Sequence, residues 1–251
     1  MLIKQLYENF SNQENVQKQF KKTGKKNVLF VTPTITGENF YRIMMPYASL
    51  SRQGYGVALM GVTAYNPTQS YEKRVTTGLN SKHIIWASTI VFPFTTQPLK
   101  TIFQSIKTVN PNCKIVYNLD YNVFHLPSYH PLKQEITEEK INSVEENILY
   151  ADLTLVDNEF LKEYLLNKHF EDKKMPEGLE QVGGIEVLPL IGNYTSMFGK
   201  LQPPDKQDSI LKIAIPIGNW QYEELKQAVH SLSELQKKTN ALEFVIMGGS
   251  S

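Results

Sequence analysis

Short apolar runs rich in β-branched residues alternate along this chain with segments whose apolar positions recur at helical spacing. The alternation is typical of parallel β-α-β units, because a strand buried on both faces is continuously apolar whereas a covering helix has one apolar stripe. The sequence therefore predicts an α/β fold, a Rossmann-like parallel sheet with helices on both faces. The predicted strands include NVLFVT, GVALMG, CKIVYNL, DLTLVD and IEVLPL.

Helices are predicted between these strands. After the first strand, apolar residues recur three and four positions apart, and Gly54 follows as the expected end of the helix. The recurring positions are Phe40, Ile43, Met44, Tyr47 and Leu50. Helical patterns also lie within 97–109 and 137–151. Another helix follows Asp157 or Asn158, either of which can cap its first turn.

The middle of this region has weaker signals. Residues 62–82 are polar without a clear period, and we expect them to form a loop with short irregular structure. HIIWA and TIVFPF then form either two short strands or one interrupted unit, with Pro93 stopping the second. CKIVYNL is apolar on both faces, which predicts a central strand of the sheet.

The chain divides into four predicted parts. Residues 1–26 are an N-terminal helical extension, and residues 27–191 are one coherent Rossmann-like domain. Residues 192–209, with two adjacent prolines and polar neighbours, resemble an interdomain linker. Residues 210–251 read as strand, helix and strand. About forty residues cannot cover both faces of a parallel sheet, so we expect them to begin an incomplete second Rossmann-like unit of a truncated chain.

Composition narrows the possible functions. The 251 residues are 41% apolar, and 26 basic against 25 acidic side chains leave a formal net charge of +1. This charge provides no general field to attract nucleic acid or an anionic membrane. The single cysteine, Cys113, excludes a disulfide framework and fits a reducing compartment, so we expect a cytoplasmic protein. No segment is apolar for long enough to predict a signal peptide or a transmembrane segment.

The loop after the first strand, PTITGEN, leads into a helix whose first N–H groups can receive a phosphate. Thr36, Gly37 and Arg42, one helical turn further on, are therefore candidate phosphate contacts. Alternatively, Thr36 or Asn39 caps the helix, and Arg42 is solvated or ion-paired with a loop acid. There is no G-x-G-x-x-G and no Walker lysine motif, which disfavours a dinucleotide oxidoreductase or a P-loop enzyme.

A second polar loop, DYNVFHLPSYHP, follows the central strand. Asp120 lies at the carboxyl end of that strand, where open α/β sheets bind ligands. Tyr121 can stack on a ring and His125 can bond to hydroxyl groups. Alternatively, Asp120 caps a turn and the histidines are exposed. Pro127 between His125 and His130 does not fit a helical zinc site, so no metal is expected.

The last segment contains a similar turn. In IPIGNW a strand passes into a loop, where Gly218 and Asn219 can lie beside a ligand held between two domains.

Taken in order, these segments resemble a known family. VLFVTPTITGENFYRIMMPYASLSRQGYGVALMG, IVYNLDYNVFHLPSYHP, EENILYADLTLVDNEFLKEYL and IEVLPLIGNYTSMF are similar to the amino-terminal domain of GT-B glycosyltransferases of the family-4 type. LKIAIPIGNWQYEELKQAVHSLSELQKKTNALEFVIMGG looks like the start of the carboxy-terminal, donor-binding domain. The resemblance covers nearly all of residues 26–249 and rests on the order of the pieces more than on rare residues.

The resemblance implies transfer of a sugar from a nucleotide-sugar to an unidentified acceptor, in a cleft between two domains and without a metal or further cofactor. By analogy the reaction retains stereochemistry. It places Thr36, Gly37 and Arg42 on the donor-phosphate side together with Gly218 and Asn219. It places Asp120, Tyr121 and His125 on the acceptor side. The family's paired glutamates would lie in a later segment, so this chain alone is expected to be inactive and no catalytic residue is assigned.

Two other functions stay open. The chain departs from the family pattern at Asn118, Tyr121 and Leu190, which favours a non-catalytic Rossmann-like binding or assembly module derived from a glycosyltransferase. The third possibility is a nucleotide-dependent epimerase with the same two-domain build.

Overall fold

The computed structural model describes residues 20, 26–32, 40–61, 73, 75–76, 79, 81–128, 130–171, 182–188, 211–216, 222–238 and 242–247. The chain forms two compact units, residues 1–123 with 137–197 and residues 124–136 with 198–251. The predicted N-terminal helix, apart from Phe20 and Lys26, and the predicted linker at 192–209 lie outside the described residues.

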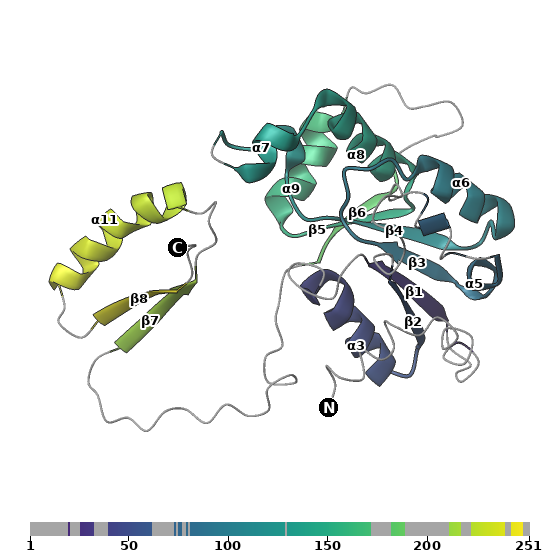
Figure 1. Ribbon diagram of the computed structural model, residues 1–251, viewed down its shortest axis with the longest axis horizontal. Coiled ribbons are helices and arrows are strands. Elements are labelled where there is room, and N and C mark those ends of the chain that lie inside the picture. The colour runs from purple at the N-terminus through teal and green to yellow at the C-terminus, as the bar shows by residue number, and fades with distance from the viewer. Residues whose placement is uncertain are drawn as a thin grey trace. The chain divides into compact units, whose positions relative to one another are not determined.

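The first unit is built on a parallel sheet of six described strands in the order β2-β1-β3-β4-β5-β6 (Figure 1). The strands are β1 (Asn27–Thr32), β2 (Gly56–Gly61), β3 (Thr89–Phe92), β4 (Lys114–Leu119), β5 (Leu153–Val156) and β6 (Gly184–Val187). The predicted Rossmann-like α/β class is confirmed, and β4 is central as expected. The strand order reverses at β1, which creates a topological switch point between β1 and β3.

Helices pack on both faces of this sheet. They are η1 (Phe40–Met44), α3 (Met45–Arg52), α5 (Ser81–Trp86), α6 (Lys100–Val109), α8 (Glu138–Tyr150), α9 (Glu159–Tyr164) and η3 (Leu165–His169). Val91 packs in one apolar cluster with Ile43 and Tyr47 of η1 and α3. Phe92, the next residue of β3, packs its ring 5.0 Å from that of Phe103 on α6. Since successive strand residues point to opposite faces, η1-α3 and α6 cover different sides of the sheet.

The first helix ends where the sequence predicts. Gly54 has φ of 80°, a left-handed conformation that favours glycine. Its N–H donates to the Ser51 carbonyl, and the N–H of Tyr55 donates to the Leu50 carbonyl, both at 3.1 Å. These bonds satisfy carbonyls of the last turn, so the chain can reverse directly into β2.

The strand predicted at HIIWA is wrong, because these residues lie largely in helix α5. The N–H of Ala87 donates to the His83 carbonyl at 3.0 Å, the spacing of an α-helical turn. His83 and Ile84 are buried, whereas Ile85 is exposed. A short apolar run does not distinguish a strand from a helix by its period, and in the fold this run forms a helix beside α6.

The second unit contains two described parallel strands, β7 (Leu211–Pro216) and β8 (Leu242–Met247), joined through α11 (Tyr222–Lys238). The predicted strand, helix and strand are thus confirmed. The same unit contains α7 (Pro131–Glu135), and η2 (Val123–His125) runs into it.

Asn147 joins two helices on the α6 side of the sheet. Its side chain is fully buried; Oδ1 accepts from the Leu99 N–H at 2.8 Å, and Nδ2 donates to the Gln97 carbonyl at 3.0 Å. Leu99 is the residue before the first turn of α6 and has no side-chain cap of its own. A residue of α8 therefore supplies the cap that the local sequence lacks.

We expect Asn147→Leu to lower the free energy of unfolding by about 2–3 kcal/mol, because it leaves the buried Leu99 N–H without its partner and also removes the hydrogen bond to the Gln97 carbonyl. Urea denaturation measures this loss. Asn142→Leu, at an exposed position of the same helix, is the matched control and should change stability little. Equal effects of the two substitutions would contradict the capping role.

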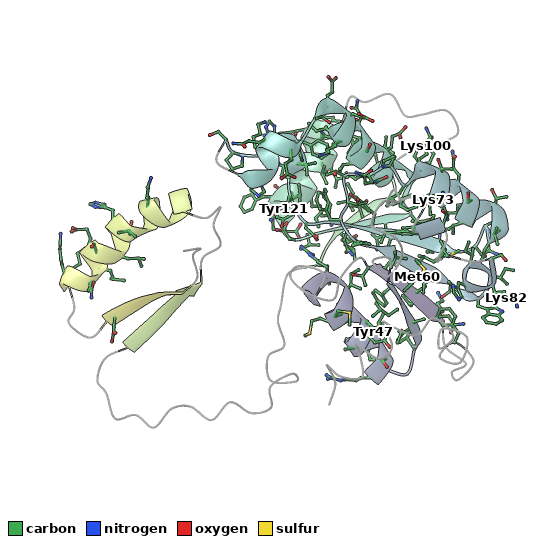
Figure 2. The ribbon with its side chains drawn as sticks, in the orientation of Figure 1. Tyr47, Met60, Lys73, Lys82, Lys100 and Tyr121 are labelled. Carbon is green, nitrogen blue, oxygen red and sulfur yellow. The ribbon has the colours of Figure 1, made fainter. Side chains whose placement is uncertain are left out.

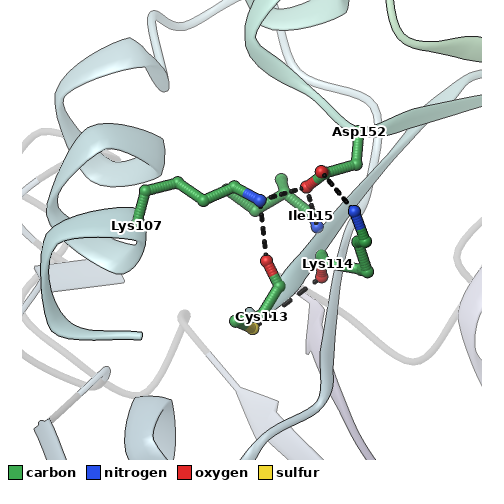
Figure 3. Close-up of polar contacts among 5 residues, drawn as sticks. All are labelled: Lys107, Cys113, Lys114, Ile115 and Asp152. Atoms are coloured by element: carbon green, nitrogen blue, oxygen red, sulfur yellow. Dashed lines mark hydrogen bonds and ion pairs between the residues drawn. The ribbon is translucent and has the colours of Figure 1, made fainter. Parts of the chain in front are cut away.

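A second polar cluster lies where β4 and β5 begin (Figure 3). Asp152 accepts from Lys107 Nζ at 2.6 Å, from Lys114 Nζ at 3.2 Å and from the Ile115 N–H at 2.8 Å. Burial acts to raise the pKa of Asp152, but these hydrogen bonds outweigh it and the pKa lies below the ordinary value of 3.8. Lys107 also donates to the Cys113 carbonyl. Asp152 therefore ties α6 to the amino-terminal ends of two strands.

Asp152→Asn should destabilise the protein at neutral pH, and the difference from the native chain should shrink as the pH falls below about 3.8. The folded pKa is depressed, so the carboxylate's contribution is present above the unfolded pKa and is lost as the pH falls through the folded pKa. Thermal unfolding at a series of pH values measures it. Glu186→Gln removes a carboxylate that is 63% exposed and serves as control; a pH-independent difference for Asp152→Asn would contradict the assignment.

Candidate functional site

The carboxyl ends of β4, β5 and β6 meet at one edge of the sheet because the strands are parallel. Asp120, Asp157 and Leu188 each directly follow one of these strands. Positions that are far apart in the sequence are therefore neighbours at this edge.

The side chain of Arg42, a residue of η1, reaches this edge of the sheet. Its Nε lies 3.0 Å from Oδ1 of Asp120, and its Nη1 donates a short hydrogen bond to the Leu188 carbonyl. The side chain of Arg42 is only 2% exposed and that of Asp120 only 8%. One guanidinium thus connects η1 with the residues that follow β4 and β6.

The distance between Arg42 and Asp120 is that of an ion pair, but the angle at Nε does not meet the requirement of a hydrogen bond. Nη2 of Arg42 has no hydrogen-bond partner among the described residues. The sequence left three roles open for Arg42: a phosphate contact, a solvated side chain and an ion pair with a loop acid. The structure shows the ion pair, with Asp120 as the acid. Its assignment to a donor phosphate stays a prediction. The structure brings together two residues that the sequence suggested separately for opposite sides of a cleft.

Beside this ion pair lies a hollow of about 290 Å³. Its lining comes from the turn after β4 and from the turn that leads from β5 into α9. The lining residues are Asp120, Tyr121, Asn122, Asp157, Asn158, Phe160 and Leu161. Figure 2 shows Tyr121 at the end of the sheet near α9. We call this feature the edge hollow.

Local structure fixes the polar wall of the edge hollow. Asn158 caps α9, its Oδ1 accepting from the Leu161 N–H at 2.9 Å, which confirms one of the two predicted caps. Its Nδ2 donates to Asp157 Oδ1 at 2.8 Å and so orients that carboxylate. The ring of Tyr121 packs edge to face with the ring of Phe94, and their centroids are 5.6 Å apart. The carboxylates and aromatic residues are thereby held on short, internally bonded turns.

Phe160 stands out among the lining residues because its side chain is 84% exposed. It follows Glu159 at the start of α9, while the next residue, Leu161, is 4% exposed and anchors the helix. Because the Asn158 cap sets where the helix begins, it also sets which residue faces the core. Phe160 is left beside a polar hollow as an accessible ring.

The remaining candidates lie elsewhere or are not described. Thr36, Gly37, Gly218 and Asn219 lie outside the described residues, as does Leu190. His125 is exposed at the end of η2, and His130 is 7% exposed. Both belong to the second unit.

The sequence did not single out Asn122 and Phe160 as binding residues. Their positions in the sequence could have identified them. Asn122 follows β4 and Phe160 follows β5, and the carboxyl ends of these two strands lie at the same edge of the sheet.

Among the described residues, no cluster of three or more histidine, cysteine or acidic side chains could hold a metal ion. The one cysteine, Cys113, is buried, and burial raises the pKa of its thiol to about 11. None of the described helices has the length and apolar character needed to cross a membrane. No protein-family model and no curated protein matches the chain.

Replacing either member of the buried ion pair should be strongly destabilising. We expect Arg42→Met and Asp120→Asn each to lower the free energy of unfolding by about 3–5 kcal/mol, because each leaves the other charged or polar group buried without its partner. The double variant should lose less than the sum of the two single losses. Urea denaturation of all three variants measures the coupling free energy between Arg42 and Asp120.

Lys162→Met is the control for the ion pair, because it breaks the contact between Lys162 and the largely exposed Glu186. Exposed ion pairs contribute little, so its effect should be small. Additive losses in the Arg42 and Asp120 cycle would show that the two side chains do not depend on each other.

Proposed function

We propose that this chain is part of a glycosyltransferase that moves a sugar from a nucleotide-sugar to an acceptor, with the edge hollow on the acceptor side. The observation that carries the proposal is the lining of the hollow, where two carboxylates and two amides surround an accessible aromatic ring at the ligand-binding edge of a parallel sheet. A sugar offers hydroxyl groups to the polar atoms and a C–H face to the ring.

The organisation of the chain supports the proposal. A six-stranded Rossmann-like sheet is followed along the sequence by a second parallel strand-helix-strand unit. Two such units are what the resemblance to GT-B glycosyltransferases requires. In the proposal, the diphosphate leaving group is stabilised by backbone N–H groups and cations, without a metal. Thr36 and Gly37, with Gly218 and Asn219, are the candidates for that donor side.

Asp120 has a defined part in the proposal. Its carboxylate lines the edge hollow and contacts Arg42 on its buried side. The guanidinium fixes its position and provides the counter-charge that a buried carboxylate needs. We propose that Asp120 accepts a hydrogen bond from an acceptor hydroxyl, with Arg42 as its positioning residue.

One observation favours the alternative, a non-catalytic Rossmann-like binding module. Arg42 is 2% exposed and contacts Asp120 and the Leu188 carbonyl. A donor phosphate could use this cation only if those contacts were broken. A module that binds a saccharide without a nucleotide would leave the ion pair intact.

Isothermal titration of nucleotide diphosphates and nucleotide-sugars against the protein distinguishes these functions. The glycosyltransferase predicts saturable binding of a nucleotide-sugar that weakens about tenfold or more in Gly37→Val, because the added side chain blocks a close phosphate approach. Circular dichroism of the variant establishes that it is folded. The absence of binding to any nucleotide or nucleotide-sugar, together with saccharide binding, would favour the module.

A further inference from the structure

We propose that the edge hollow recognises a single sugar ring without acidic substituents, which stacks on Phe160 and donates hydrogen bonds to the carboxylates. The inference rests on the proposed function only for the assignment of the hollow to the acceptor. It adds the chemical class of that acceptor, since it excludes phosphorylated sugars, uronic acids and other anionic groups from this position.

The ring contact follows from the exposure of Phe160. The side chain is 84% exposed and lines the hollow, whereas its neighbour Leu161 anchors α9 in the core. Leaving a phenyl ring in water forgoes the gain of burying it, and the fold of α9 does not require an aromatic residue at this exposed position. A ring beside polar groups matches a ligand that has an apolar face and a polar rim, as a pyranose does.

The charge of the lining selects against anions. Asp120 and Asp157 contribute two carboxylates, and none of the described lining residues is a lysine, arginine or histidine. Arg42 reaches Asp120 from its buried side and is not part of the lining. A phosphate or carboxylate on the ligand would meet like charges in a partly desolvated site.

The hydrogen-bonding capacity of the lining points the same way. Ionised carboxylates only accept hydrogen bonds. Oδ1 of Asn122 is a buried acceptor with no hydrogen-bond partner among the described residues. The Asn158 amide already donates to Asp157 and accepts from Leu161. Among the described lining residues, the two carboxylates and Oδ1 of Asn122 are acceptors, so they complement a ligand that donates through hydroxyl or ammonium groups.

The size of the hollow suits one sugar ring. Its volume of about 290 Å³ lies at the small end of ligand pockets, which run from roughly 300 to 1,000 Å³. A longer saccharide would have to extend beyond the described lining.

The test is NMR titration of the protein with glucose, glucosamine and glucose 6-phosphate. Glucose and glucosamine should shift the amide signals of Tyr121 and Phe160 in a saturable way, and glucose 6-phosphate should bind about tenfold or more weakly than glucose. Phe160→Ala should weaken glucose binding about tenfold. Asp157→Asn should reduce the discrimination against glucose 6-phosphate.

The control variant is Leu166→Ala, which shortens another exposed apolar side chain on the neighbouring η3 and should leave sugar binding unchanged. Binding of glucose 6-phosphate as tight as that of glucose would overturn the proposal. So would the absence of saturable shifts with any of the sugars, or unchanged binding in Phe160→Ala. If a nucleotide-sugar still binds and only these results fail, the glycosyltransferase proposal stands and the acceptor class is wrong.

Discussion

The arrangement of the sheet's carboxyl edge depends on one buried guanidinium. Arg42 comes from the helix after β1, and its side chain contacts Asp120 after β4 and the Leu188 carbonyl after β6. A charge that is 2% exposed is tolerated only where partners replace the lost water. The positions of these partners are therefore linked to one another. The position of Asp120, one of the two carboxylates that line the edge hollow, depends on Arg42 in the helix that follows β1.

The acidic residues at the two edges of the same sheet differ in their contacts. At the amino-terminal edge, Asp152 accepts hydrogen bonds from two lysines and a backbone N–H. At the carboxyl-terminal edge, Asp157 and Asn122 border open space, and Phe160 faces solvent. Both edges contain acidic residues, but Asp152 is held by three donors, whereas Oδ1 of Asn122 at the carboxyl-terminal edge has no hydrogen-bond partner among the described residues. The presence of acidic residues does not by itself distinguish the candidate site from the other edge. The two edges differ in how many of their polar atoms form hydrogen bonds within the protein.

The burial of Arg42 also bears on how a GT-B-like domain would divide its work. In the proposed transferase, Arg42 positions Asp120 on the acceptor side and can contact a phosphate only if the contact with Asp120 is broken. The phosphate contacts of a transferase would then come from backbone N–H groups and from the second unit. A binding module would need no such contacts. The contact between Arg42 and Asp120 is compatible with both proposed functions, which differ in whether a donor side is present.

The sequence by itself determined the class of the fold, most of its elements and the edge at which to look. Strand and helix periods, Gly54 at a helix end and Asn158 at a helix start are local signals, because they depend on neighbours within a few residues. Only the tertiary structure decided that HIIWA is helical, that Asn147 caps α6, and that Arg42 is bound to Asp120 rather than exposed. The last two depend on partners 48 and 78 positions away and the first on tertiary packing, and no local pattern encodes a contact whose partner is set by how the strands are ordered.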